Sequence, residues 1–398
     1  MSEPKLTPSQ PNLAPLTASP KRVRVMQVIT HLGLGGAERI VFTIMKGLAG
    51  TFDFRLFAVL GVEPGEVGAG FYAEAQDLGL RLLTGTHVPV KYGGMVLAGR
   101  QLAKAVKAEQ PDVIHLHTEI PESVYAAAVM LQPKIGRIPL VRTIQNSVYW
   151  MPWRRMGRWC ERRMSRPFVA GASKAAAEAF LQLRQESGTG PPPVPPRVIF
   201  NSVSVDQPVQ PREPSGSGAV RLLFAGRFED QKGADLLPDI IRRVKPPRAC
   251  ELMIYGSGTH EATLRQLSAS PPAGWNIHLH GPVSNLSSLM PSFDLLLMPS
   301  RYEGLSLMAL ESLLLGLPVI ATRAQGFREG FPADYPWMAP PGDAVAYAEL
   351  ISRVLSEPQT WRGVAEAGGR FARRNFSVEG MCEAYHRLYA EAVTAASA

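Results

Sequence analysis

The chain has 398 residues, too many for one hydrophobic core, and roughly two domains of about 150 to 200 residues each are expected. Apolar residues make up 45% of the sequence and aromatic residues 8%, which predicts packed globular domains. The formal charge of +8 predicts attraction to anions, but it does not distinguish nucleotides, nucleic acid and an acidic membrane surface.

Several classes of protein are excluded by the absence of their sequence signals. No apolar run reaches the roughly 20 uncharged residues that span a bilayer; the longest, residues 305–322, contains Glu311 and Pro318. No signal-peptide core precedes Lys21, so we expect a cytoplasmic protein. The three cysteines lie far apart, which argues against a disulfide framework or a compact metal site.

The N-terminal half has the pattern of a doubly wound domain. Residues 1–20 are rich in Pro and Ser without periodicity, which predicts a disordered tail. An apolar strand at 23–29, a glycine turn and a helix at 37–48 follow. Further strands at 54–60, 113–116 and 140–144, with a helix at 97–107, are apolar enough for a parallel sheet covered on both faces. We assign this α/β domain to residues 21–206.

A second α/β domain follows a linker. Residues 207–218 combine Pro with a Ser-Gly repeat, which is typical of a flexible connection. Predicted strands at 221–225, 252–255, 277–279, 295–298 and 318–322 then alternate with helical patterns, and we assign residues 219–375 to this domain. Residues 361–393 are expected to be helical with a break near 375–378.

Residues 303–311 combine two carboxylates with the start of a predicted helix. Glu303, Gly304 and Leu305 follow a strand and are expected beside a helix N-terminus, where backbone N–H groups favour a phosphate. Glu311 lies about two turns further on and could hold the other end of an extended ligand. In the alternative, Glu303 caps the helix and Glu311 is a surface charge; the apolar neighbours of Glu311 favour the functional interpretation.

Two cations follow the first strand of the second domain. Arg227 and Lys232 lie in a loop bounded by Gly226 and Gly233. They could stabilise negative charge on a departing diphosphate, a task that a metal ion performs elsewhere. Two ordinary surface cations are the alternative.

Five motifs in chain order resemble those of the retaining GT-B glycosyltransferases of family 4. They are residues 33–38 (GLGGAE), 112–117 (DVIHLH), 171–174 (GASK), 226–233 (GRFEDQKG) and 303–322, with Glu303 and Glu311. The resemblance covers about residues 23–385. It implies an α/β GT-B fold, with two Rossmann-like domains facing across a cleft and the C-terminal helix, residues 376–398, crossing back to the N-terminal domain.

The resemblance also implies an activity and a site. We expect retaining transfer of a hexose or N-acetylhexosamine from a nucleotide sugar, a UDP-sugar first and a GDP-sugar next, without cofactor or essential metal; no Asp-x-Asp motif occurs. The acceptor would be a glycan, a lipid-linked or a small molecule, in polysaccharide or glycoconjugate biosynthesis. The implied catalytic residues are His117, Arg227, Lys232 and Glu303. The implied donor-binding residues are Gly35, Gly36, Gly256, Val283, Gly304, Leu305, Ser306 and Glu311.

Three features qualify this assignment. The glycine turn fails the strict dinucleotide fingerprint, so a plain tight turn is its alternative. Ser306 stands where the family often has Pro, and the loops at 201–206 and 324–326 also depart from the family pattern, which leaves the donor sugar open. We expect His115 and His117 to point to opposite faces of their strand, with His117 toward the cleft and His115 structural.

A basic aromatic segment precedes the end of the first domain. It contains Trp150, Trp153, Arg154, Arg155 and Arg158, which suit an anionic, lipid-linked acceptor or peripheral contact with the inner face of an anionic membrane. A surface helix with its tryptophans docked on the domain is the alternative. Rival functions are a nucleotide-sugar epimerase, a sugar-nucleotide sensor and a nucleic-acid-binding protein. No nucleic-acid-binding motif accompanies the basic residues, so no nucleic acid partner is expected.

Overall fold

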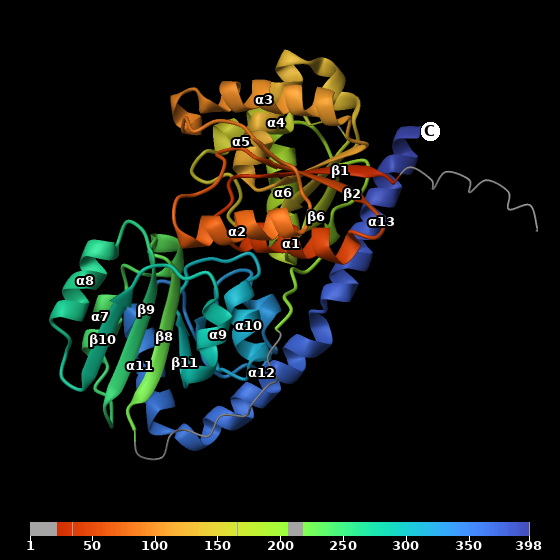
Figure 1. The fold of residues 1–398 in the computed structure, drawn as a ribbon. Helices are drawn as coiled ribbons and strands as arrows, with labels where there is room; N and C mark the ends of the chain where they lie inside the picture. The colour runs from red at the N-terminus through yellow and green to blue at the C-terminus, as the bar shows by residue number, and fades with distance from the viewer. Residues whose placement is uncertain (1–21, 34, 165, 206–217, 398) are drawn as a thin grey trace, which may run out of the picture.

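The computed structural model describes residues 22–33, 35–164, 166–205 and 218–397. The predicted tail at 1–20 and the predicted linker, apart from Gly218, lie outside these residues. The described chain forms two parallel sheets, each covered by helices on both faces, with a long C-terminal helix that reaches back to the first sheet (Figure 1). This arrangement confirms the predicted α/β fold, whereas the predicted domain limits stay predictions.

The first sheet has seven strands in the order β3-β2-β1-β4-β5-β6-β7. Its strands are β1 (Arg24–Ile29), β2 (Asp53–Ala58), β3 (Leu82–Thr84), β4 (Val113–His117), β5 (Leu140–Ile144), β6 (Phe168–Gly171) and β7 (Arg197–Val198). Its helices are α1 (Gly36–Leu48), α2 (Glu66–Asp77), α3 (Gly94–Glu109), α4 (Glu119–Leu131), α5 (Arg154–Glu161) and α6 (Lys174–Ser187). One apolar core lies beneath α3 to α6, and a second lies beneath α1 and α2 on the other face.

The second sheet has six strands in the order β10-β9-β8-β11-β12-β13. Its strands are β8 (Val220–Arg227), β9 (Cys250–Ser257), β10 (Trp275–His280), β11 (Leu295–Met298), β12 (Val319–Thr322) and β13 (Met338–Ala339). Its helices are α7 (Leu237–Arg243), α8 (Glu261–Ala269), α9 (Leu286–Leu289), α10 (Leu307–Leu314), α11 (Ala344–Ser356) and α12 (Trp361–Asn375). In both sheets the strand order reverses direction in the interior, and the crevice at such a point is where parallel sheets bind ligands.

The last helix, α13 (Val378–Ser397), belongs to the core of the first domain. Its Tyr389 hydroxyl lies 2.9 Å from Gln27 Nε2 on β1 and 2.8 Å from His115 Nδ1 on β4. Tyr385 contacts Thr143 on β5 in the same way, at 2.9 Å. The prediction that the C-terminal helix crosses back to the first domain is therefore confirmed.

A buried charged cluster lies under α4, α5 and α6. Arg142 on β5 is fully buried and donates to Glu122 at 3.1 Å and to Glu161 at 2.7 Å. Arg184 on α6 donates to the other oxygen of Glu161, also at 2.7 Å. Two cations therefore match two carboxylates, as burial of charge requires. None of the helices within the described residues has the length and apolar character needed to cross a membrane.

Candidate functional site

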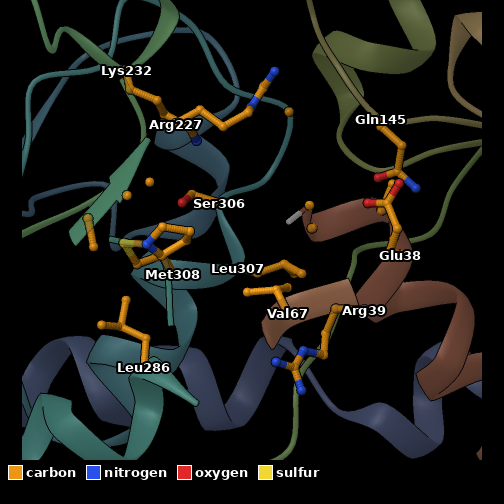
Figure 2. Close-up of a pocket in the computed structure, with 18 of the residues that line it drawn as sticks. Glu38, Arg39, Val67, Gln145, Arg227, Lys232, Leu286, Ser306, Leu307 and Met308 are labelled. Carbon is orange, nitrogen blue, oxygen red and sulfur yellow. The ribbon is translucent and has the colours of Figure 1, made fainter. Parts of the chain in front are cut away.

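A cleft of about 530 Å³ lies between the carboxyl ends of the two sheets (Figure 2). The loops after β1, β4 and β5 form one wall, and the loops after β8, β9, β10 and β11 form the other. Most of the residues predicted for the site line it: Gly35, Gly36, Arg227, Lys232, Gly256, Val283, Glu303, Gly304, Leu305, Ser306 and Glu311. Residues that are far apart in sequence meet here because they each follow a strand of a parallel sheet.

Lys232 and Glu303 form the central charged pair of the cleft. Lys232 Nζ lies 2.7 Å from Glu303 Oε1, and the Ser300 hydroxyl donates to the same oxygen at 2.8 Å. Glu303 is 4% exposed, so its charge is held almost entirely by these two partners. The pair places a fixed cation at the mouth of the second sheet.

Arg227 adds a second cation beside this pair. It is the last residue of β8, is exposed, and donates to Gln231 Oε1 at 2.8 Å. Figure 2 shows Arg227 and Lys232 on one wall and Glu38 and Gln145 on the opposite wall. The charge of Arg227 counteracts part of the burial effect on the pKa of Glu38, so the guanidinium acts across the cleft.

The helix after Glu303 is capped by another residue. Ser306 is the N-cap of α10 and accepts from the Ala309 N–H at 3.4 Å. The alternative in which Glu303 caps this helix is therefore wrong. Glu303 is instead free to engage Lys232, and α10 begins only at Leu307.

Glu311 lies in the cleft wall rather than on the outer surface. It is half-buried on α10, and burial raises the pKa of its carboxyl while the nearby Arg39 acts in the opposite direction. Arg39 also donates to the backbone oxygen of Ser284 at 3.3 Å and thus joins α1 to the loop after β10. Glu311 is positioned to accept hydroxyl hydrogen bonds from a ligand in the cleft.

Further contacts hold the domains together around the cleft. The Ser147 hydroxyl donates to the backbone oxygen of Glu303 at 2.9 Å. The Glu329 carboxylate accepts from the Lys174 and Ala175 N–H groups at 2.8 and 3.2 Å, so a residue of the second domain satisfies the N-terminus of α6. The two domains are thus in direct hydrogen-bonded contact around the cleft.

The structure places His117 behind the cleft wall. Its side chain is 1% exposed, Nε2 lies 2.8 Å from Gln27 Oε1, and burial lowers its pKa to about 3. His115 and His117 do not point to opposite faces: their ring centroids lie 3.9 Å apart, because residues two apart on a strand share a face. His117 is not among the residues that line the cleft, so its expected role as a catalytic residue that contacts the transferring sugar or the acceptor stays a prediction.

Two carboxyls of the first domain were not singled out from the sequence. Glu38 lines the cleft, is 5% exposed, and burial raises its pKa to about 7. Glu119 at the start of α4 also lines the cleft, and burial raises its pKa as well. Glu38 lies within the glycine motif and Glu119 two residues after His117, but neither position alone indicates that the side chain faces a cavity.

The basic aromatic segment is divided between core and surface. Trp150 is 5% exposed and donates from Nε1 to Glu122 at 3.0 Å, so it is docked on the domain, which contradicts a membrane-facing role. Arg154 is paired with both oxygens of Glu186 at 2.8 and 2.9 Å. Trp153 is 61% exposed, Arg155 is exposed and Arg158 is half-exposed. None of these described residues lines the cleft.

Two protein-family models match most of the chain. The Glycosyltransferase Family 4 model matches residues 34–207, and the Glycosyl transferases group 1 model matches residues 219–357. Among curated proteins, the chain is similar to the lipopolysaccharide core biosynthesis glycosyltransferase LpsE of Rhizobium meliloti, with 27% identity over 173 residues, 42% of this chain and 49% of LpsE. The matched segment thus spans about half the length of that relative.

Two further similarities cover more of the chain. A glycogen synthase of Mycobacterium tuberculosis is 24% identical over 315 residues, 74% of this chain and 73% of that enzyme. The crystal structure of Anabaena HepE in complex with UDP-glucose superimposes with a TM-score of 0.73 at 18% identity, covering 94% of this chain and all of HepE. At that identity the structural similarity shows a shared fold.

Proposed function

Since the chain belongs to the glycosyltransferases of the group 1 and family 4 models and has the GT-B fold, we propose that it transfers a hexose or N-acetylhexosamine from a nucleotide sugar to a glycan, lipid-linked or small-molecule acceptor. The observation that carries the proposal is the Lys232–Glu303 pair beside Arg227 in the interdomain cleft. UDP-sugars are the favoured donors because HepE was solved with UDP-glucose, and GDP-sugars come next. The similarity to LpsE supports a place in cell-surface glycan biosynthesis.

In the proposed mechanism the protein's own cations replace a metal ion. Arg227 and Lys232 neutralise the charge that develops on the departing diphosphate. Glu303, with the amides of Gly304 and Leu305, orients the donor sugar, and Glu311 accepts hydrogen bonds from the ribose. Retention follows if the acceptor attacks the face from which the diphosphate leaves and the diphosphate takes the acceptor proton.

Nucleotide-sugar binding in EDTA tests this proposal. The melting temperature is measured with a panel of UDP-, GDP- and ADP-sugars, because a ligand that binds only the folded state raises it. Selective stabilisation in EDTA supports a metal-free donor site, and stabilisation that requires a divalent cation contradicts it. The anomeric configuration of the product, determined by NMR, then tests retention, and conversion of the donor without any acceptor would indicate an epimerase instead.

The Lys232→Ala variant tests the catalytic assignment. Loss of one charged group that stabilises the transition state lowers turnover by roughly 100 to 1,000-fold. Lys46→Ala is the matched control, since Lys46 forms an ion pair of the same length, 2.7 Å to Glu74, in α1 and α2. Near-normal turnover of Lys232→Ala with an intact fold would remove Lys232 from the mechanism.

A separate part of the proposal concerns the acceptor side. Trp153, Arg155 and Arg158 suit contact with an anionic bilayer or a lipid-linked acceptor, because an exposed indole and nearby guanidinium groups match the membrane interface. Flotation with phosphatidylglycerol vesicles, against phosphatidylcholine vesicles, measures this contact. Trp153→Ala should reduce binding, whereas wild-type protein that does not float with the anionic vesicles would refute it.

A further inference from the structure

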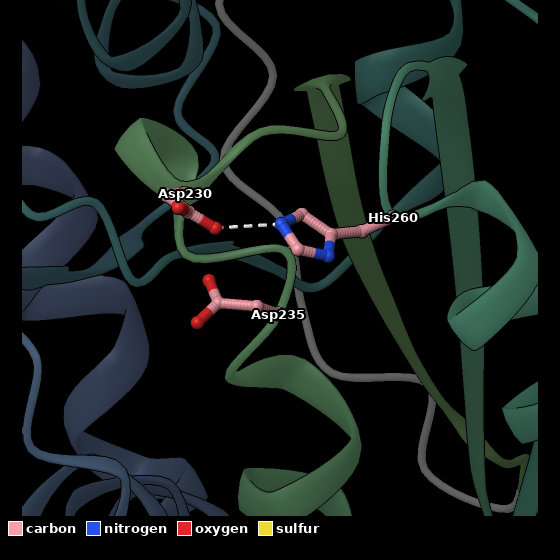
Figure 3. Close-up of side chains that lie close together, drawn as sticks. All are labelled: Asp230, Asp235 and His260. Carbon is pink, nitrogen blue, oxygen red and sulfur yellow. Dashed lines mark hydrogen bonds and ion pairs between the residues drawn. The ribbon is translucent and has the colours of Figure 1, made fainter.

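Asp230, Asp235 and His260 lie close together (Figure 3), and Gln231 and Lys232, between the two aspartates in the chain, line the cleft. His260 Nε2 lies 2.6 Å from Asp230 Oδ1, and one potential ligand atom from each residue lies within 4.8 Å of the others. Both oxygens of Asp235, however, accept from Arg301, at 2.6 and 2.7 Å. A guanidinium bound in this bidentate manner already supplies the positive charge that a metal ion would bring, so the cluster has the chemistry of an ion-pair brace.

Arg301 holds the loop that carries Lys232 at several points. Besides its two bonds to Asp235, its guanidinium donates to the backbone oxygen of Asp230 at 2.7 Å. Its own N–H donates to the backbone oxygen of Gln231 at 2.8 Å. The segment fixed by these contacts, residues 230–235, includes Lys232.

Arg301 also belongs to the loop that carries Glu303, two residues further on. The two loops are in direct contact: Gly233 has a φ of 71°, and a Cβ on it would lie 2.2 Å from the backbone oxygen of Pro299. Only glycine fits both that conformation and that separation. Arg301 therefore joins the two segments whose side chains form the 2.7 Å Lys232–Glu303 pair.

We propose that Arg301 and Asp235 are positioning residues of the transfer site, which hold residues 230–235 so that the Lys232 ammonium faces Glu303 and the departing diphosphate. The proposal rests on the proposed function and adds residues to it. Neither Arg301 nor Asp235 lines the cleft, so both act through Lys232. The pair is also partly exposed, with side-chain exposures of 32% and 26%, and such pairs stabilise the fold only weakly.

Because the Arg301–Asp235 pair stabilises the fold only weakly, substitutions in it can distinguish a positioning role, which affects turnover, from a structural role, which affects stability. Arg301→Lys keeps the charge but loses the bidentate geometry. A displacement of about 1 Å at a catalytic group can lower turnover roughly 100-fold, so we expect turnover to fall by about 10 to 100-fold with little change in melting temperature. Asp235→Asn should behave in the same way. Arg243→Lys is the matched control, since Arg243 pairs with Asp239 at 2.9 Å within α7, outside the cleft.

Two measurements decide the proposal. Acetylation of lysines by acetic anhydride, quantified by mass spectrometry, reports the Lys232–Glu303 pair without any substrate. Arg301→Lys should raise Lys232 labelling several-fold relative to Lys46, and unchanged labelling would overturn the proposal.

In a double-mutant cycle, Arg301→Lys should lower turnover in the wild-type background but change it by less than about twofold with Lys232→Ala, because coupled residues are non-additive. Equal losses in both backgrounds would also overturn it.

The two proposals fail in different ways. Raised Lys232 labelling in Arg301→Lys, in a protein that binds no nucleotide sugar, would support the brace and refute the proposed function. Nucleotide-sugar turnover by wild-type protein, with Lys232 labelling unaffected by Arg301→Lys, would support the proposed function and refute the positioning role of Arg301.

Discussion

Gly304 lies where the two domains touch, and replacing it by Ala should force them apart. A Cβ at this position would lie 1.6 Å from the backbone oxygen of Gln145. Because real Cβ contacts essentially never fall below 3.0 Å, the two loops would have to separate by at least about 1.4 Å. Misplacement of about 1 Å can cost roughly 100-fold in rate, so turnover of Gly304→Ala should fall by about that factor.

The assay compares turnover with nucleotide binding. UDP release from the nucleotide sugar selected by thermal stabilisation gives turnover, and calorimetry gives the affinity for UDP. Affinity should change much less than turnover, because Lys232 and Glu303 both belong to the second domain. Gly363→Ala is the control, since a Cβ there meets no atom within 4 Å. If Gly304→Ala keeps more than about half of the wild-type turnover, close contact of the walls is not needed.

Three other substitutions have expected outcomes. Burial raises the pKa of Glu38 from 4.5 to about 7, so the free energy of unfolding of the wild-type protein should fall by roughly 3 kcal/mol as pH rises between these values and then level off. Glu38→Gln should lose this pH dependence, which is measured by urea unfolding at pH 5 and pH 8. Arg142→Met removes the cation that pairs with the buried Glu122 and one of the two cations that pair with Glu161, so it should cost about 3 to 5 kcal/mol and lower the melting temperature by roughly 10 °C. An unchanged melting temperature would contradict the buried network. Glu329→Gln weakens the contact with the N-terminus of α6 by about 0.3 to 1 kcal/mol, and a larger radius of gyration in small-angle X-ray scattering should follow.

Local patterns predicted two parallel sheets, and the family resemblance predicted most of the residues that line the cleft. The predicted strand at 221–225 lies inside β8, and the break near residues 375–378 separates α12 from α13. Each strand has its own apolar run, and residues that follow parallel strands gather at one edge. The family resemblance assigned Arg227, Lys232 and Glu303 to one site, and this rule explains why the structure brings them together.

What could not be predicted depends on distant partners. Trp150 appeared suited to a membrane, but its partner Glu122 lies 28 residues away on another element. Arg142 lies in the middle of an apolar strand, and nothing local indicates the two carboxylates that neutralise it. The error at His115 and His117 was of another kind, since the two-residue period of a strand places both rings on one face.

The path of the final helix has a consequence for biosynthesis. Residues 24–198 are translated first, yet Tyr385 and Tyr389, which complete their core, are translated after the whole second domain. During translation the surface of the first domain beneath α13 therefore stays uncovered until α13 has been synthesised. The first domain can complete its core only after the second domain has been made. Ribosome-bound chains that end before residue 378 should expose this surface to chaperones. Chains in which α13 has left the ribosome should not.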